Sequence, residues 1–129
     1  MAITLWFVGP EGPLKAGLER IEEALASRRY WLDLEIGDMP LLAPFQEQLM
    51  GHPLNWEDAG KPTQRPKLEE QGDHLFLVMR GLDTTHHRLA DQLHTIQLAC
   101  FLSAESLITI RSGPMATVEY VVKRDDTAG

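Results

Sequence analysis

This 129-residue sequence has a single cysteine, no long apolar run and no excess of basic residues. Cys100 is the only cysteine, so no internal disulfide can form, and a reducing cytoplasm is the simplest compartment. No apolar run approaches the ~18–20 residues that a membrane helix requires, so we expect a soluble chain, either by itself or as part of a membrane protein. The apolar start is short and lacks a basic leader, which favours a strand over a signal peptide.

Basic residues are outnumbered in the sequence. It has 12 Lys and Arg against 19 Asp and Glu, a formal net charge of −7. Nucleic-acid binding needs a concentrated basic surface, so we expect no nucleic-acid partner, whereas an acidic surface leaves room for cations. The hydrophobic fraction of 43% is that of an ordinary globular protein, and the length fits one domain over residues 1–129.

The sequence also lacks the motifs of common enzyme sites. It contains no Gly-x-Ser-x-Gly, no Walker loop, no Gly-x-Gly-x-x-Gly and no Cys-x-x-Cys. Cys100 lies in the middle of an apolar strand pattern, which indicates a buried, inert thiol rather than a nucleophile. We therefore expect no catalytic site and no enzymatic activity.

Strands and helices alternate in the first half of the predicted structure. Residues 3–8 are rich in β-branched and aromatic residues and predict a strand that Gly9-Pro10 ends. A helix is expected to open at Gly12-Pro13, because apolar residues recur at helical spacing up to Leu25. Residues 30–36 alternate and predict a second strand, with Asp33 on the same side as two neighbours, Trp31 and Glu35.

Prolines divide the middle of the chain. A helix starting near Pro44 and stopping at Gly51 is expected, because Pro44 would break a longer helix across residues 38–50. Pro53 then begins a short helix through Ala59, and Gly60 ends it. Two further prolines and no apolar residue predict a loop over residues 61–66.

Strands dominate the second half. Residues 68–70 begin a strand, residues 71–73 form a tight turn, and the continuous apolar run 75–79 predicts a central strand buried on both faces. After a polar connection over 83–91, residues 93–102 and 107–110 form the clearest hairpin, and Pro114 can start a helix. The sequence thus predicts a mixed sheet of roughly six strands covered by helices, an α/β sandwich.

Histidines offer a possible zinc site. His86 and His87 are adjacent in the polar connection, but adjacent ligands rarely close one tetrahedral site, and no second pair stands at the usual spacing. His94 shares a strand face with apolar residues, which favours a hydrogen-bonded core histidine. His52, directly before Pro53, is interpreted as the residue that leads into a helix.

Glu57 and Asp58 are the more interesting ligands. Adjacent carboxylates on a short helix are hard oxygen donors of the kind that hold magnesium or calcium. A pair is far from a complete site, and by composition alone a solvated acidic turn is the commoner outcome. Arg65 and Lys67 can pair with this turn or with residues 69–70, and surface pairs of that kind contribute little to stability.

The order of these motifs is more specific than any one of them. The chain reads His52-Pro53-Leu54, then Glu57-Asp58, then Gln64-Arg65-Pro66-Lys67 before an apolar strand. Trp31-Leu32-Asp33-Leu34 precedes them and the late hairpin follows. Over residues 30–111 this arrangement resembles the N-terminal cytoplasmic domain of CorA-type divalent-cation transporters.

The resemblance implies a three-layer α/β/α sandwich that leads into a long stalk helix and two membrane helices. In the family, five copies form a funnel on the cytoplasmic face of the membrane, and the Glu-Asp pair contributes to a regulatory magnesium site with acidic residues of the neighbouring subunit's stalk. Carried over, the metal ligands are Glu57 and Asp58, with Asp58 the stronger candidate. The implied function is a domain that senses Mg²⁺ at subunit interfaces and controls gating.

The chain departs from the family pattern at its end. It stops at Gly129, where the stalk is expected, and has no membrane helices and no Gly-Met-Asn pore motif. We therefore expect an excised or truncated domain that is a monomer or weak dimer by itself and part of a pentamer in the full-length transporter. Two alternatives stay open. One is a member of the zinc-transporting, ZntB-like branch, with Zn²⁺ or Co²⁺ as the ion and His86, His87 and His94 of interest; the other is a stand-alone soluble adaptor.

Overall fold

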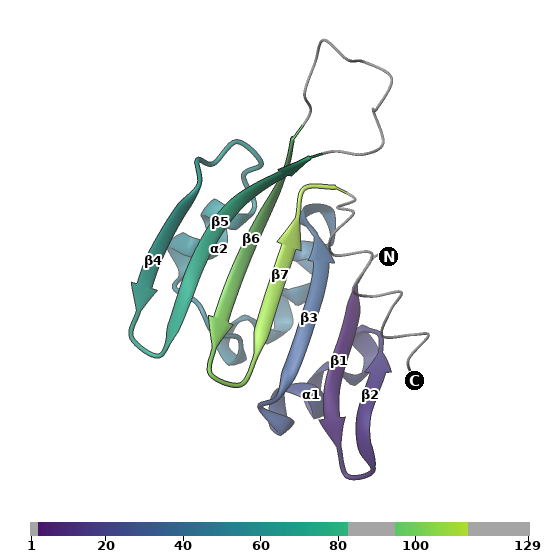
Figure 1. Ribbon diagram of the computed structural model, residues 1–129. Helices are drawn as coiled ribbons and strands as arrows, with labels where there is room; N and C mark the ends of the chain where they lie inside the picture. The colour runs from purple at the N-terminus through teal and green to yellow at the C-terminus, as the bar shows by residue number, and fades with distance from the viewer. Residues whose placement is uncertain (1–2, 83–94, 114–129) are drawn as a thin grey trace.

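A mixed seven-stranded sheet forms the frame of the protein (Figure 1). The computed structural model describes residues 3–82 and 95–113. In these residues the strand order is β2-β1-β3-β7-β6-β5-β4. The strands are β1 (Thr4–Gly9), β2 (Gly12–Ala16), β3 (Tyr30–Glu35), β4 (Lys67–Gln71), β5 (His74–Leu82), β6 (Thr95–Ser103) and β7 (Leu107–Arg111).

One parallel pairing joins the two halves of the sheet. Strands β2, β1 and β3 pair antiparallel with one another, and so do β4, β5, β6 and β7. Strand β3 then runs parallel to β7, with Asp33 opposite Thr109. Because every other neighbouring pair is antiparallel, the position of the N-terminal half relative to the C-terminal half depends on this register.

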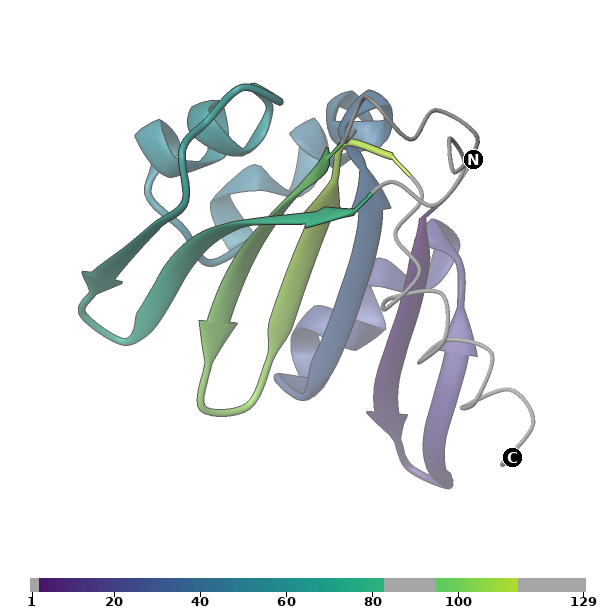
Figure 2. The same ribbon diagram turned by 45° about the horizontal axis from the view of Figure 1, so that its top comes forward.

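The described helices all cover one face of the sheet, as Figures 1 and 2 show from two directions. They are two 3-10 helices, η1 (Leu18–Arg20) and η2 (Ile36–Gln48), and two short α-helices, α1 (Ile21–Ser27) and α2 (Pro53–Ala59). The expected mixed α/β fold is confirmed, with seven strands instead of about six. The described helices and the sheet supply two of the three layers expected. Within the described ranges, no helix is long and apolar enough to cross a membrane.

The main core lies between the sheet and these helices. Each strand near the centre contributes side chains that are almost fully buried, and each helix contributes at least one partly buried residue. Sealing one large aliphatic or aromatic side chain from water contributes about 1.5–3 kcal/mol. The largest members from the sheet are Leu5, Leu32, Leu34, Phe76, Phe101, Ile108 and Ile110.

Helix α2 is fixed to this core through a stacked aromatic pair. Trp56 is buried and stacks on Phe101 of β6 with 4.6 Å between ring centroids and 19° between ring planes. The indole Nε1 of Trp56 donates a hydrogen bond to the carbonyl of Met50 at 3.0 Å. Gly51 lies directly under this pair at φ +117°, a conformation that other residues rarely adopt.

The opposite face of the sheet carries a second, smaller apolar cluster of Ile96, Leu98 and Cys100. The prediction of a buried thiol at Cys100 is confirmed, and burial raises the pKa of this thiol to about 11. A thiol with that pKa is almost entirely protonated at neutral pH, so it is a poor nucleophile.

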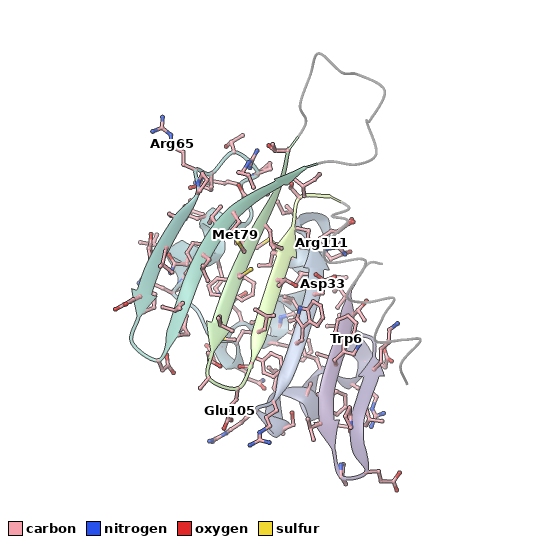
Figure 3. All side chains as sticks on the ribbon, viewed as in Figure 1. Trp6, Asp33, Arg65, Met79, Glu105 and Arg111 are labelled. Carbon is pink, nitrogen blue, oxygen red and sulfur yellow. The ribbon has the colours of Figure 1, made fainter. Side chains whose placement is uncertain are left out.

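A buried ion pair lies on the same face, between β3 and β7 (Figure 3). Arg111 donates to Asp33 from Nε at 3.2 Å and from Nη2 at 2.9 Å, and Thr109 Oγ1 donates to the same carboxylate at 2.7 Å. Trp31 Nε1 in turn donates to Thr109 Oγ1 at 2.9 Å. Burial raises the pKa of Asp33, although the bonds from Thr109 and the charge of Arg111 act in the opposite direction.

Three expectations about the secondary structure are wrong. The helix expected from Gly12-Pro13 is a strand, β2, because this segment turns back to pair with β1, and Lys15 lies opposite Trp6. Helix α1 begins only at Ile21. The helix expected between Pro44 and Gly51 is instead the longer 3-10 helix η2, which contains both Pro40 and Pro44.

The third wrong expectation concerns the apolar run 75–79. It lies in a strand, β5, but β5 is next to the edge strand β4 and is not central. Only its helix-facing residues Phe76 and Val78 are buried, whereas Met79 on the other face is 41% exposed. A run of apolar residues does not report how far a strand lies from the edge of its sheet.

Other expectations agree with the structure: strand 3–8, strand 30–36, helix 53–59, loop 61–66, turn 71–73 and the hairpin. The polar connection 83–91, His94 and the helix expected from Pro114 lie outside the described residues.

We predict that Asp33→Asn lowers the free energy of unfolding by about 3–5 kcal/mol, because it leaves the Arg111 guanidinium buried without a carboxylate. Urea unfolding followed by circular dichroism measures this loss. The double variant Asp33→Leu/Arg111→Met is the matched control. It is expected to regain most of the stability, because apolar residues of similar size remove both buried charges. A loss below about 1 kcal/mol in Asp33→Asn would contradict the role given to the pair.

Gly51→Ala is predicted to destabilise the fold by roughly 2 kcal/mol or more, because a Cβ requires strained backbone and displacement of the aromatic pair. That Cβ would lie 2.5 Å from Trp56 Nε1 and 2.6 Å from Phe101 Cε1. Gly37→Ala is the control, since no heavy atom lies within 4 Å of the added Cβ there. Equal urea midpoints for the two variants would show that Gly51 is not needed to seat α2.

Candidate functional site

The acidic turn predicted from the sequence is the C-terminal half of α2. His52 has extended backbone and its Nδ1 accepts a hydrogen bond from the Leu54 amide at 3.0 Å. Its carbonyl accepts from the amides of Asn55 and Trp56. Pro53 occupies the first turn, where its missing N–H group leaves no bond unmade. The interpretation of His52 as the residue leading into the helix is confirmed.

Helix α2 turns its acidic residues away from the core. Trp56 and Ala59 are buried against the sheet, so the positions between them face outward. The Glu57 side chain is 59% exposed and the Asp58 side chain 27%. Both candidate metal ligands therefore lie at the surface and are open to an ion or to another chain.

Each carboxylate already contacts a lysine. Glu57 Oε1 lies 3.1 Å from Lys61 Nζ, an exposed pair one helical turn apart. Asp58 Oδ2 lies 2.7 Å from Lys67 Nζ, at the start of β4. The second pair is shorter, and it joins two separate elements. The pairing of Lys67 with this turn agrees with the sequence analysis, whereas Figure 3 shows Arg65 projecting from its loop away from the sheet.

The Lys67 ammonium has further partners. Its Nζ lies 3.3 Å from Glu69 Oε1 and 5.5 Å from the centre of the Phe76 ring. The hydrogen bond to Asp58 is the largest influence on this ammonium and raises the pKa of Lys67. The charged form of the lysine is therefore held more firmly than in an unpaired side chain.

The loop between α2 and β4 is fixed by residues that sequence reasoning missed. Gln97 is fully buried on β6, and its Oε1 accepts from the Gln64 amide at 2.9 Å and from Arg80 at 3.3 Å. Arg80 also donates to the carbonyl of Pro62 at 2.8 Å. These bonds hold the loop so that Lys67 enters β4 beside Asp58. In the sequence, a glutamine inside an apolar strand could have indicated that Gln97 makes such a contact.

The donor set fits part of a magnesium site and not a closed one. Among residues 3–82 and 95–113, no group of three or more His, Cys, Asp or Glu side chains comes together. Asp58 and Glu57 thus offer two carboxylates from one short helix. Mg²⁺ often keeps several waters and takes only one or two carboxylates from a protein, so this turn can serve as one half of a shared site. The metal-binding role of both residues stays a prediction.

The histidines divide into two groups. His86, His87 and His94, named in the zinc alternative, lie outside the described residues. His74 is a partly buried residue, with a side chain 8% exposed, that sequence reasoning did not single out. Its Nδ1 lies 3.0 Å from Asp73 Oδ1, and its ring lies 6.2 Å from the Phe101 ring in a tilted contact.

Solved structures share this fold. The soluble domain of CorA from Methanocaldococcus jannaschii matches with a TM-score of 0.68 at 17% identity, over 98% of this chain and 46% of that chain. The full-length CmaX protein matches with a TM-score of 0.71 at 17% identity, over 95% and 38%. The ZntB cytoplasmic domain from Vibrio parahaemolyticus RIMD 2210633 matches with a TM-score of 0.66 at 12% identity, over 93% and 47%. The chain thus spans less than half the length of each of these structures.

The sequence itself gives the family. Comparison with curated proteins yields no significant match. A family model described as CorA-like Mg2+ transporter protein matches residues 27–128, which include α2, the loop after it and the four strands of the C-terminal half. Since this match extends over most of the chain, the protein belongs to the CorA-like Mg2+ transporter family.

Proposed function

We propose that this chain is the cytoplasmic cation-sensing domain of a CorA-like magnesium transporter, in which Asp58 and Glu57 supply one side of a regulatory Mg²⁺ site between subunits. The observation that carries the proposal is the acidic end of α2. Two carboxylates face outward from a helix whose other side is locked into the core by Trp56. In a member of this transporter family, such a turn is suited to a cation shared with a neighbouring copy.

Electrostatic repulsion between copies of the chain is the basis of the proposed mechanism. Each copy carries a formal net charge of −7, so acidic surfaces of neighbouring copies repel one another. A divalent cation between two such surfaces replaces repulsion by attraction to both. When the ion leaves, the copies can shift, and the shift opens the pore. Cation binding thereby biases a two-state homopentamer that is anchored in the membrane by other segments.

Binding to one isolated chain is expected to be weak. The described residues supply only two carboxylates at this turn, and each of them contacts a lysine. Partly exposed pairs of this kind contribute about 0–1 kcal/mol, so a divalent cation can displace the lysines. The remaining ligands come from water and from a second subunit, which makes affinity depend on assembly. The chain alone is expected to be a monomer or a weak dimer.

Asp58→Asn tests this function. In the transporter that contains this chain, reconstituted in vesicles, we expect the Mg²⁺ concentration that half-inhibits flux to rise about fivefold or more, because the variant removes one of few ligand charges. Glu22→Gln, an exposed carboxylate on α1, is the control with the same change of charge and is expected to leave the midpoint unchanged.

An unchanged midpoint in Asp58→Asn would refute the role of this turn. Titration of the chain itself, followed by the backbone amide shifts of α2 in NMR spectra, gives a second reading that does not depend on transport. Parallel titrations with Zn²⁺ and Co²⁺ identify the ion that the turn prefers. Hard carboxylate oxygens favour Mg²⁺ coordination, whereas Zn²⁺ prefers nitrogen and sulfur ligands.

A further inference from the structure

Lys67 occupies a position that is built for a cation. Its Nζ lies 2.7 Å from Asp58 Oδ2 and 3.3 Å from Glu69 Oε1, and the face of the Phe76 ring lies 5.5 Å away. These three partners come from α2, β4 and β5, so the ammonium is contacted by three separate elements of the fold while the Lys67 side chain stays 29% exposed. Two carboxylates and an aromatic face are groups that stabilise a bound cation.

We propose that Lys67 is a tethered competitor, whose ammonium must move away from Asp58 before a divalent cation can bind that carboxylate. This inference rests on the proposed function of Asp58 and concerns its regulation. Lys67 thereby sets the cation concentration at which the domain responds. Without the lysine, the turn would bind the ion at lower concentration, and the response would begin too early.

The charges of the site support this assignment. Asp58 and Glu69 each carry −1 and Lys67 carries +1, so the group has a net charge of −1 with the lysine and −2 without it. A divalent cation is drawn more strongly to the second arrangement. The lysine and its carboxylates are 27–37% exposed, which allows the ion to reach them while solvent screens the change only in part.

Glu69 offers the Lys67 ammonium a second partner once it has left Asp58. Glu69 lies on the same strand and faces the same side, so the ammonium can leave Asp58 and keep its second carboxylate. Its backbone pairs with Val78 in the β4–β5 ladder and need not move. Displacement therefore involves a rotation of one side chain, with no charge left unpaired in a half-buried site.

Lys61 provides a matched comparison on the same turn. It pairs with Glu57 at 3.1 Å across one helical turn, and both side chains are more than half exposed. Among the contacts of the described residues, its Nζ has this one carboxylate partner, whereas the Lys67 ammonium has two. Replacing Lys61 therefore removes the same charge from the same turn, at a position where the described residues supply one carboxylate partner and no aromatic ring.

The test is Mg²⁺ binding to the chain, measured by calorimetry at constant ionic strength. Lys67→Met keeps an apolar stem over Phe76 and removes the charge; we expect its affinity for Mg²⁺ to rise about fivefold or more. Lys67→Arg keeps the charge and is expected to change affinity less than about twofold. Lys61→Met removes a charge beside Glu57 and is expected to raise affinity less than Lys67→Met does, because the Lys61–Glu57 pair is more than half exposed and screened by solvent. In Lys67→Met/Asp58→Asn the gain is expected to disappear.

A second measurement uses the unmodified protein and does not depend on any variant folding. As Mg²⁺ is added, the side-chain ¹³Cε resonance of Lys67 is expected to shift with the same midpoint as the amides of α2. Equal Mg²⁺ affinity of Lys67→Met and the unmodified chain would overturn the proposal, as would a Lys67 resonance that does not respond. Absence of saturable binding in both proteins would also overturn it.

The outcomes separate this inference from the proposed function. If Asp58→Asn abolishes the Mg²⁺ response while Lys67→Met leaves it unchanged, Asp58 is a ligand and Lys67 is not its competitor. If Asp58→Asn leaves the response unchanged, the function proposed for the acidic turn fails. Urea midpoints of all variants show whether a change in affinity comes from the site or from a loss of folding.

Discussion

The parallel register of β3 and β7 is the constraint on which the rest of this structure depends. The N-terminal strands and the C-terminal strands form two antiparallel groups, and among the strands of residues 3–82 and 95–113 this pair alone joins them. A carboxylate and a guanidinium buried side by side, Asp33 and Arg111, fix the register, since a slip of one residue would leave both charges unpaired in the interior. Helices that cover both groups of strands can then pack on one continuous surface.

The acidic turn gains its position from the same frame. Strand β6 lies next to β7, and its Phe101 receives the Trp56 ring of α2, so the helix is placed by the sheet and not by its own length. A helix of seven residues would not be stable alone. The result is a helix held against the sheet with its carboxylates on the outer side, and Lys67 reaches Asp58 from β4. In the function proposed for this site, sensing involves movement of ions and side chains more than of backbone.

Features with local causes were predictable from the sequence. Helix α2 was predicted to the residue, because Pro53 and Gly60 define its ends locally. The β2 segment was misread because Gly12-Pro13 can open a helix or a hairpin, and only its pairing with β1 decides between them. The acidic pair was found by its chemistry and its motif. Its pairing with Lys67 was one of two options that the sequence left open. The loop that brings Lys67 to Asp58 is held by Gln97, which lies thirty-three residues after Gln64, so local sequence could not decide between the options.

The two borders of the sheet limit how copies of this chain can join. At one border β2 is short and contains Pro13, which has no N–H group to donate; at the other, β4 alternates Lys67 and Glu69 with exposed neighbours. Prolines and charges at such borders discourage the addition of a further strand. Copies of the domain are therefore poorly suited to merging their sheets into one. A ring of them would be held by surface side chains and ions, which can be loosened and re-formed without unfolding any subunit.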